Sequence, residues 1–73
     1  MRVRLRLSNQ ELSDDLLDFL RRRECVGERT EGGRLLEVSL PHELHEKQAR
    51  MELDLLLRVW QTMHPGTRIR VED

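Results

Sequence analysis

The two ends of the chain carry the same alternation of arginine with an aliphatic residue. It runs through residues 2–7 as RVRLRL and returns in residues 68–71 as RIRV. A period of two is typical of a strand with one buried face, so the aliphatic residues should face a core and the arginines the opposite side. If the two strands pair, their arginines share one side of a sheet. We call this the arginine face, and it comprises Arg2, Arg4, Arg6, Arg68 and Arg70.

A chain of 73 residues is expected to form a single domain, residues 1–73. A domain of this size buries only about 60% of its unfolded surface, so long apolar side chains should be assigned to the core first. Cys25 is the one cysteine and cannot form an internal disulfide. No apolar run approaches the roughly 20 residues that span a bilayer, and no signal peptide is evident. We therefore expect a cytoplasmic protein without membrane contact. The net charge of −1 predicts no global attraction to nucleic acid.

The sequence between the two arginine strands divides into predicted helices and strands. Residues 8–11, SNQE, match a capping box and should begin a helix that ends near Glu24. A weak strand at 25–30 and a strand at 34–40 flank Gly32 and Gly33, which favour a hairpin turn. Pro41 should end that strand and begin a long helix over 42–63. The final strand is predicted at 67–72.

This order predicts an α+β fold with a ferredoxin-like, split βαββαβ arrangement. Its four-stranded antiparallel sheet has the strand order 4-1-3-2, with both helices on one face. The first strand then lies between the third and the fourth. An intertwined or swapped dimer built from the same elements is the competing arrangement.

The arginine face admits three interpretations. Five guanidinium groups on a shallow sheet could bind phosphates or an acidic peptide, because each offers planar bidentate donors. Alternatively they are a solvated face, paired across strands with Glu28, Glu37 and Glu72. In the third interpretation they bind acidic residues on the first helix of a second subunit. Those candidate residues are Glu11, Asp14, Asp15 and Asp18.

The second helix carries more apolar residues than one contact with a sheet can cover. Between residues 53 and 59 there are four leucines and one valine, and together they surround most of the helix: Leu53, Leu55, Leu56, Leu57 and Val59. Leu55 and Leu57 cannot both face the sheet together with Leu53 and Leu56. Any that stay exposed would mark a surface for a protein partner or a homodimer, so Leu55 and Leu57 are the predicted interface residues. Val59, Trp60 and Met63 are assigned to the apolar side of the helix.

Residue types suited to catalysis or metal binding are present but poorly arranged. His42, His45 and Glu46 could share a metal ion across one helical turn, yet no further ligand is fixed. The acidic residues of the first helix point in successive directions and favour a solvated face. Arg21 to Arg23 could lower the pKa of Cys25, but a buried structural thiol is the more usual state. No nucleophile, base and orienting group can be assembled, so we expect no enzyme activity, no metal and no cofactor.

A resemblance covers most of the chain. Residues 49–60, ARMELDLLLRVW, followed by His64-Pro65-Gly66 and preceded by the opening VRLRL, resemble a group of small uncharacterised actinobacterial proteins. That resemblance implies no activity. The expected topology is also similar to RNA-recognition domains, which stack bases on aromatic residues of their central strands. The two aromatic residues here, Phe19 and Trp60, fall in predicted helices, which weakens an RNA-binding interpretation.

Together these features favour a small non-enzymatic interaction or self-association module. The alternative is anion or nucleic-acid binding through the arginine face.

Overall fold

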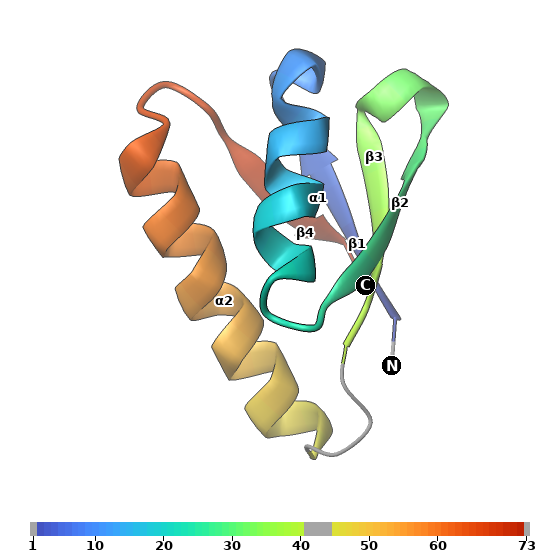
Figure 1. Cartoon of the computed structure of the whole chain (residues 1–73), viewed down its shortest axis with the longest axis vertical. Coiled ribbons are helices and arrows are strands. Elements are labelled where there is room, and N and C mark those ends of the chain that lie inside the picture. Colours follow the sequence, from blue (N-terminus) through green and yellow to red (C-terminus); the bar gives the residue numbers. More distant parts are fainter. Residues whose placement is uncertain (1, 41–44, 73) are drawn as a thin grey trace.

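The computed structural model describes residues 2–40 and 45–72. Four strands and two α-helices are arranged in two layers, with both helices on one face of the sheet (Figure 1). The predictions made for Pro41, His42 and Leu44 fall outside the described residues. In chain order the elements are β1 (Arg2–Leu7), η1 (Gln10–Leu12), α1 (Ser13–Arg21), β2 (Val26–Thr30), η2 (Glu31–Gly33), β3 (Leu35–Ser39), α2 (Glu46–Met63) and β4 (Ile69–Glu72).

The sheet is antiparallel with the order β2-β3-β1-β4, which is the predicted order 4-1-3-2 taken from its other edge. β1 pairs with β3 through Leu5 and Leu36, and with β4 through Leu5 and Val71. Each helix therefore connects two strands that have a third strand between them. The α+β, ferredoxin-like prediction is confirmed.

The core lies between the sheet and the helices. Every second residue of β1 is buried, as the alternation predicts: Val3, Leu5 and Leu7. Leu16 and Leu20 of α1 cover this layer, and so do four residues of α2 at a spacing of three and four. Those four are Ala49, Leu53, Leu57 and Trp60. Trp60 is fully buried and is the largest of the enclosed side chains.

The start of the first helix differs from the predicted capping box. Asn9, not Ser8, caps the helical segment, and its Oδ1 accepts a hydrogen bond from the Glu11 amide at 3.2 Å. The Ser8 hydroxyl accepts instead from the Arg68 amide at 2.8 Å, which joins the end of β1 to the segment before β4. The first turn is a short 3₁₀ helix, and α1 ends at Arg21 rather than near Glu24.

The turn between β2 and β3 needs glycine, as predicted. Gly33 has a φ of 95°, in the left-handed region that favours glycine. A Cβ atom at this position would come within 2.9 Å of the Ser13 hydroxyl oxygen. Ser13 is buried at the start of α1, so Gly33 also lets the hairpin turn approach that helix.

The rotation of α2 about its axis corrects three assignments that rest on the sequence alone. Leu57, a predicted interface residue, is 4% exposed and belongs to the core. Its spacing from Leu53 and Trp60 places it on the buried face. Val59 and Met63, assigned to the apolar inner side, are 52% and 56% exposed. Leu55 is 60% exposed, as an interface residue must be.

This orientation predicts very different costs for two chemically identical substitutions. Leu57→Ala should lower the free energy of unfolding by about 2–5 kcal/mol, because it leaves a cavity in the core. Leu55→Ala should change it by less than about 0.5 kcal/mol, because that side chain is largely in solvent. Urea unfolding at low protein concentration measures both. Equal losses for the two variants would contradict this orientation of α2.

Candidate interaction surfaces

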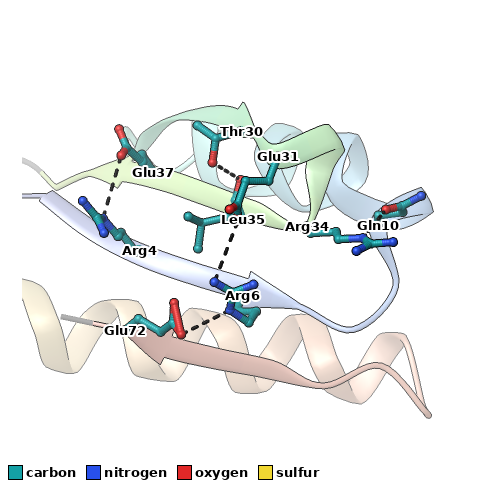
Figure 2. Close-up of polar contacts among 9 residues, drawn as sticks. All are labelled: Arg4, Arg6, Gln10, Thr30, Glu31, Arg34, Leu35, Glu37 and Glu72. Carbon is teal, nitrogen blue, oxygen red and sulfur yellow. Dashed lines mark hydrogen bonds and ion pairs between the residues drawn. The ribbon is translucent and has the colours of Figure 1, made fainter.

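The arginines of β1 lie on the side of the sheet away from the helices, and carboxylates from three elements surround them (Figure 2). Glu37 of β3 lies 3.8 Å from the Arg2 guanidinium and 3.9 Å from that of Arg4. Arg6 lies 3.8 Å from Glu31 of η2 and donates from Nε to Glu72 of β4 at 3.2 Å. The predicted pairing with Glu37 and Glu72 is thus observed. The third carboxylate that pairs with these arginines is that of Glu31, whereas the sequence predicted Glu28.

These pairs change the protonation chemistry of the surface. The hydrogen bond from Arg6 lowers the pKa of the Glu72 carboxyl, and the charges of Arg6, Arg70 and Arg4 act in the same direction. The same hydrogen bond raises the pKa of Arg6. Both groups therefore stay charged at neutral pH. A hollow of about 390 Å³ on this face is lined by Arg2 and Arg4 but also by Glu37 and Glu72, so its formal charge is balanced.

Arg70 and Arg68 differ from the arginines of β1. Arg70 lies directly opposite Arg6 in the register of β1 and β4, and Arg68 is an exposed residue just before β4. Within residues 2–40 and 45–72 neither side chain has an ion pair. The least compensated charge of the arginine face therefore lies at the edge strand β4.

The acidic residues of α1 are already engaged inside the domain. Asp14 accepts a hydrogen bond from Arg29 of β2 at 3.1 Å, and Asp18 pairs with Arg22 one turn further along α1. Asp15 contacts both Trp60 and His64 at the end of α2. The hypothesis that these carboxylates receive the arginines of a second subunit gains no support from this arrangement.

A polar network joins α1 to the end of α2, and it was not among the predictions made from the sequence. The Trp60 indole Nε1 donates to Asp15 Oδ2 at 2.9 Å. The His64 ring stacks on the Trp60 ring with centroids 4.1 Å apart. His64 Nδ1 lies 2.9 Å from the Trp60 carbonyl oxygen, and His64 Nε2 lies 3.1 Å from Asp15 Oδ2. A buried indole N–H generally has a hydrogen-bond acceptor. The assignment of Trp60 to the apolar side of the helix therefore indicated that some acceptor lies near it, but not which residue. Because both ring nitrogens are engaged, His64 is poorly placed to take a proton from a substrate.

Cys25 lies in a hollow of about 360 Å³ between the end of α1 and the first half of α2. Ala49, Leu53 and Leu56 line it on the α2 side, and Arg22 and Arg23 contribute to its walls. The thiol is buried, and burial raises its pKa, with smaller contributions in the same direction from Glu52 and Glu24. The hypothesis that Arg21 to Arg23 lower this pKa is wrong. Cys25 is therefore a neutral, structural thiol at pH 7.

The raised pKa of Cys25 predicts a loss of stability in alkali. A thiol whose pKa is higher in the folded state gives a contribution that is complete below the unfolded pKa, about 8.5, and is lost as pH rises through the folded value. The free energy of unfolding should therefore fall above about pH 9. The chain contains no tyrosine, so few other groups titrate there.

Cys25→Ala is the matched control for that titration. The difference in unfolding free energy between the wild type and this variant, followed by urea unfolding from neutral to alkaline pH, isolates the thiol. A difference that stays constant with pH would contradict the raised pKa.

Metal ligands do not come together in the part of the chain that the structure describes. No three histidine, cysteine, aspartate or glutamate side chains are grouped there so that they could hold an ion. His45 precedes the first residue of α2, and Glu46 is that residue. The third member of the predicted constellation, His42, lies outside the described residues, so a metal site there remains a prediction.

The outward side of α2 carries an unusual number of apolar side chains. Four of them are more than half exposed and follow one another every fourth residue. We call them the α2 outer ridge: Met51 (63% exposed), Leu55, Val59 and Met63. A helix that packs on a sheet through one face normally presents polar residues on the other. The ridge therefore marks a surface that the fold itself does not need.

Comparison with protein-family models, curated proteins and solved structures finds no match. Among the described residues, no helix has both the length and the apolar character that crossing a membrane requires.

Proposed function

We propose that this domain is a non-enzymatic interaction module that binds a protein surface through the α2 outer ridge. The observation that carries the proposal is the continuous row of four exposed apolar residues on a helix whose opposite face already fills the core. Exposing this row to water is unfavourable, and a partner that covers it gains the free energy of burying it.

Two further observations support a binding role rather than catalysis. The Cys25 thiol is buried and its pKa is raised, so it is not a nucleophile at neutral pH. His64 has a carbonyl oxygen at one ring nitrogen and a carboxylate at the other, so neither is open to a substrate. Cys25 and His64 are of types that can start covalent or acid–base chemistry, and their surroundings leave neither free to do so.

Photo-crosslinking tests the proposed surface directly, because it captures whichever protein covers it. A photoreactive phenylalanine analogue at position 55, on the ridge, should give an adduct of discrete mass in cells that produce the protein. The same analogue at Glu11, an exposed residue on the α1 side, is the matched control and should give none. Absence of any adduct from positions 55 and 59 would contradict the proposed function.

Anion or nucleic-acid binding through the arginine face is the second candidate. One observation favours it: Arg68 and Arg70 are exposed and have no ion pair within residues 2–40 and 45–72. Against it, the arginines of β1 are held by Glu31, Glu37 and Glu72, which an incoming phosphate would have to displace. Base-stacking aromatics are also missing from the described strands.

An amide-resolved NMR titration with a short single-stranded RNA distinguishes the two functions. Because the β1 arginines are paired and only Arg68 and Arg70 would be left to hold a phosphate, we expect no specific shifts in β1 or β4 at moderate salt. Shifts confined to these strands that weaken with added salt would support phosphate contact instead. If the double variant Arg4→Gln/Arg70→Gln then abolished them, the arginine face would replace the α2 outer ridge as the functional surface.

A further inference from the structure

The α2 outer ridge has the geometry by which two helices pack against each other. Its residues occupy one i, i+4 row, and such rows form the ridges that fit into the grooves of a second helix. Between Met51 and Met63 the row extends about 18 Å at 1.5 Å per residue. This is long enough to pass across the full width of a second helix, about 10–12 Å.

Beside the ridge lies a hollow that could hold a side chain of a second helix. This hollow of about 220 Å³ is lined by Met51, Asp54, Leu55 and Arg58. These residues are at positions i, i+3, i+4 and i+7, the four-residue arrangement that receives a side chain of a facing helix in knobs-into-holes packing. The outer side of α2 thus offers both apolar side chains that protrude and a hollow that fits one.

Two of the residues that line this hollow carry opposite charges, and neither forms an ion pair with a described residue. Asp54 and Arg58 are both exposed, and neither has an ion pair among the described residues. They are four positions apart on the same side of the helix. A second helix that runs antiparallel and is related by a two-fold axis would bring each acid close to the opposing base. The surface is therefore complementary to itself.

We propose that the partner of the α2 outer ridge is a second copy of this chain. The two-fold axis passes through the outer side of α2 at about the level of Leu57, between Leu55 and Val59. Val59 of each chain then enters the hollow of the other, and Asp54 lies near Arg58 of the partner subunit. Side chains that enter four-residue hollows of this kind are typical of helices that cross at about 20°. This inference rests on the proposed function and names its partner.

Such a contact is expected to be reversible. Two helices that cross through one face bury less than the roughly 800 Å² per partner of a standard protein interface. We therefore expect dimer dissociation constants in the micromolar range, where a domain of this size exchanges between monomer and dimer.

A charge-swap cycle tests the two-fold arrangement. Asp54→Arg and Arg58→Asp each place like charges together twice across the axis, and each should weaken dimerisation at least about tenfold. The double variant Asp54→Arg/Arg58→Asp restores opposite charges and should return the dissociation constant to within about threefold of the wild type. Sedimentation equilibrium over a range of concentrations measures all four proteins. Far-UV circular dichroism checks that each is folded.

The outcomes separate failure of this inference from failure of the proposed function. A wild-type protein that is monomeric at about 1 mM would overturn self-association. If position 55 still gave a crosslink to a different protein, the interaction function would stand with another partner. A dimer that both single variants leave unchanged, or that the double variant does not restore, would overturn the two-fold contact through Asp54 and Arg58. Val59→Asp, which puts a charge into the opposing hollow, should abolish the dimer.

Discussion

The fold depends on one strand having two different sides. β1 is the central strand of the sheet together with β3, and its buried side chains form the floor on which both helices rest. Burial of Val3, Leu5 and Leu7 requires the intervening arginines to face the other way, because side chains alternate along a strand. The arginine face is therefore a direct consequence of how the core is built.

That consequence explains why the carboxylates lie where they do. A sheet with helices on one side leaves the other side open to solvent, and a large apolar patch there would form a contact surface. Arginines held by Glu31, Glu37 and Glu72 keep this face polar and charge-balanced. Surface ion pairs of this kind add little to stability. The exposed apolar side chains gather instead on α2, where four of them form the outer ridge.

α2 carries two separate apolar faces, and only one of them serves the fold. Ala49, Leu53, Leu57 and Trp60 close the core, and the Trp60 indole is fixed further by Asp15 of α1. A small domain has few large apolar side chains, and here several are in solvent on the other side of the same helix. In small domains, oligomerisation is one of the ways in which further apolar surface is buried. The proposed contact between two copies of the chain would bury the outer ridge in this way.

The order of elements, the sheet topology and the alternation of β1 could be predicted from the sequence because each depends on a local pattern of period two or on turn residues. Which face of α2 packs on the sheet could not be predicted as well. Apolar residues are frequent from Leu53 to Val59, so several rotations of the helix about its axis would bury a similar number of apolar side chains. The decisive signal was the spacing of Leu57 from Leu53 and Trp60. Leu55 belongs instead to a second apolar row, with Met51, Val59 and Met63. The interactions of Asp15 and Ser8 with distant residues depend on the assembled fold, and no local pattern indicates them.

If α2 faces the core on one side and a second chain on the other, the amide NMR spectrum must depend on protein concentration. Upon dilution through the micromolar range, resonances of residues on the outer side of α2, from Met51 to Met63, should shift together, while those of β1 and β4 stay constant. A spectrum that does not change with concentration, or changes confined to β1 and β4, would contradict a second chain on the outer side of α2.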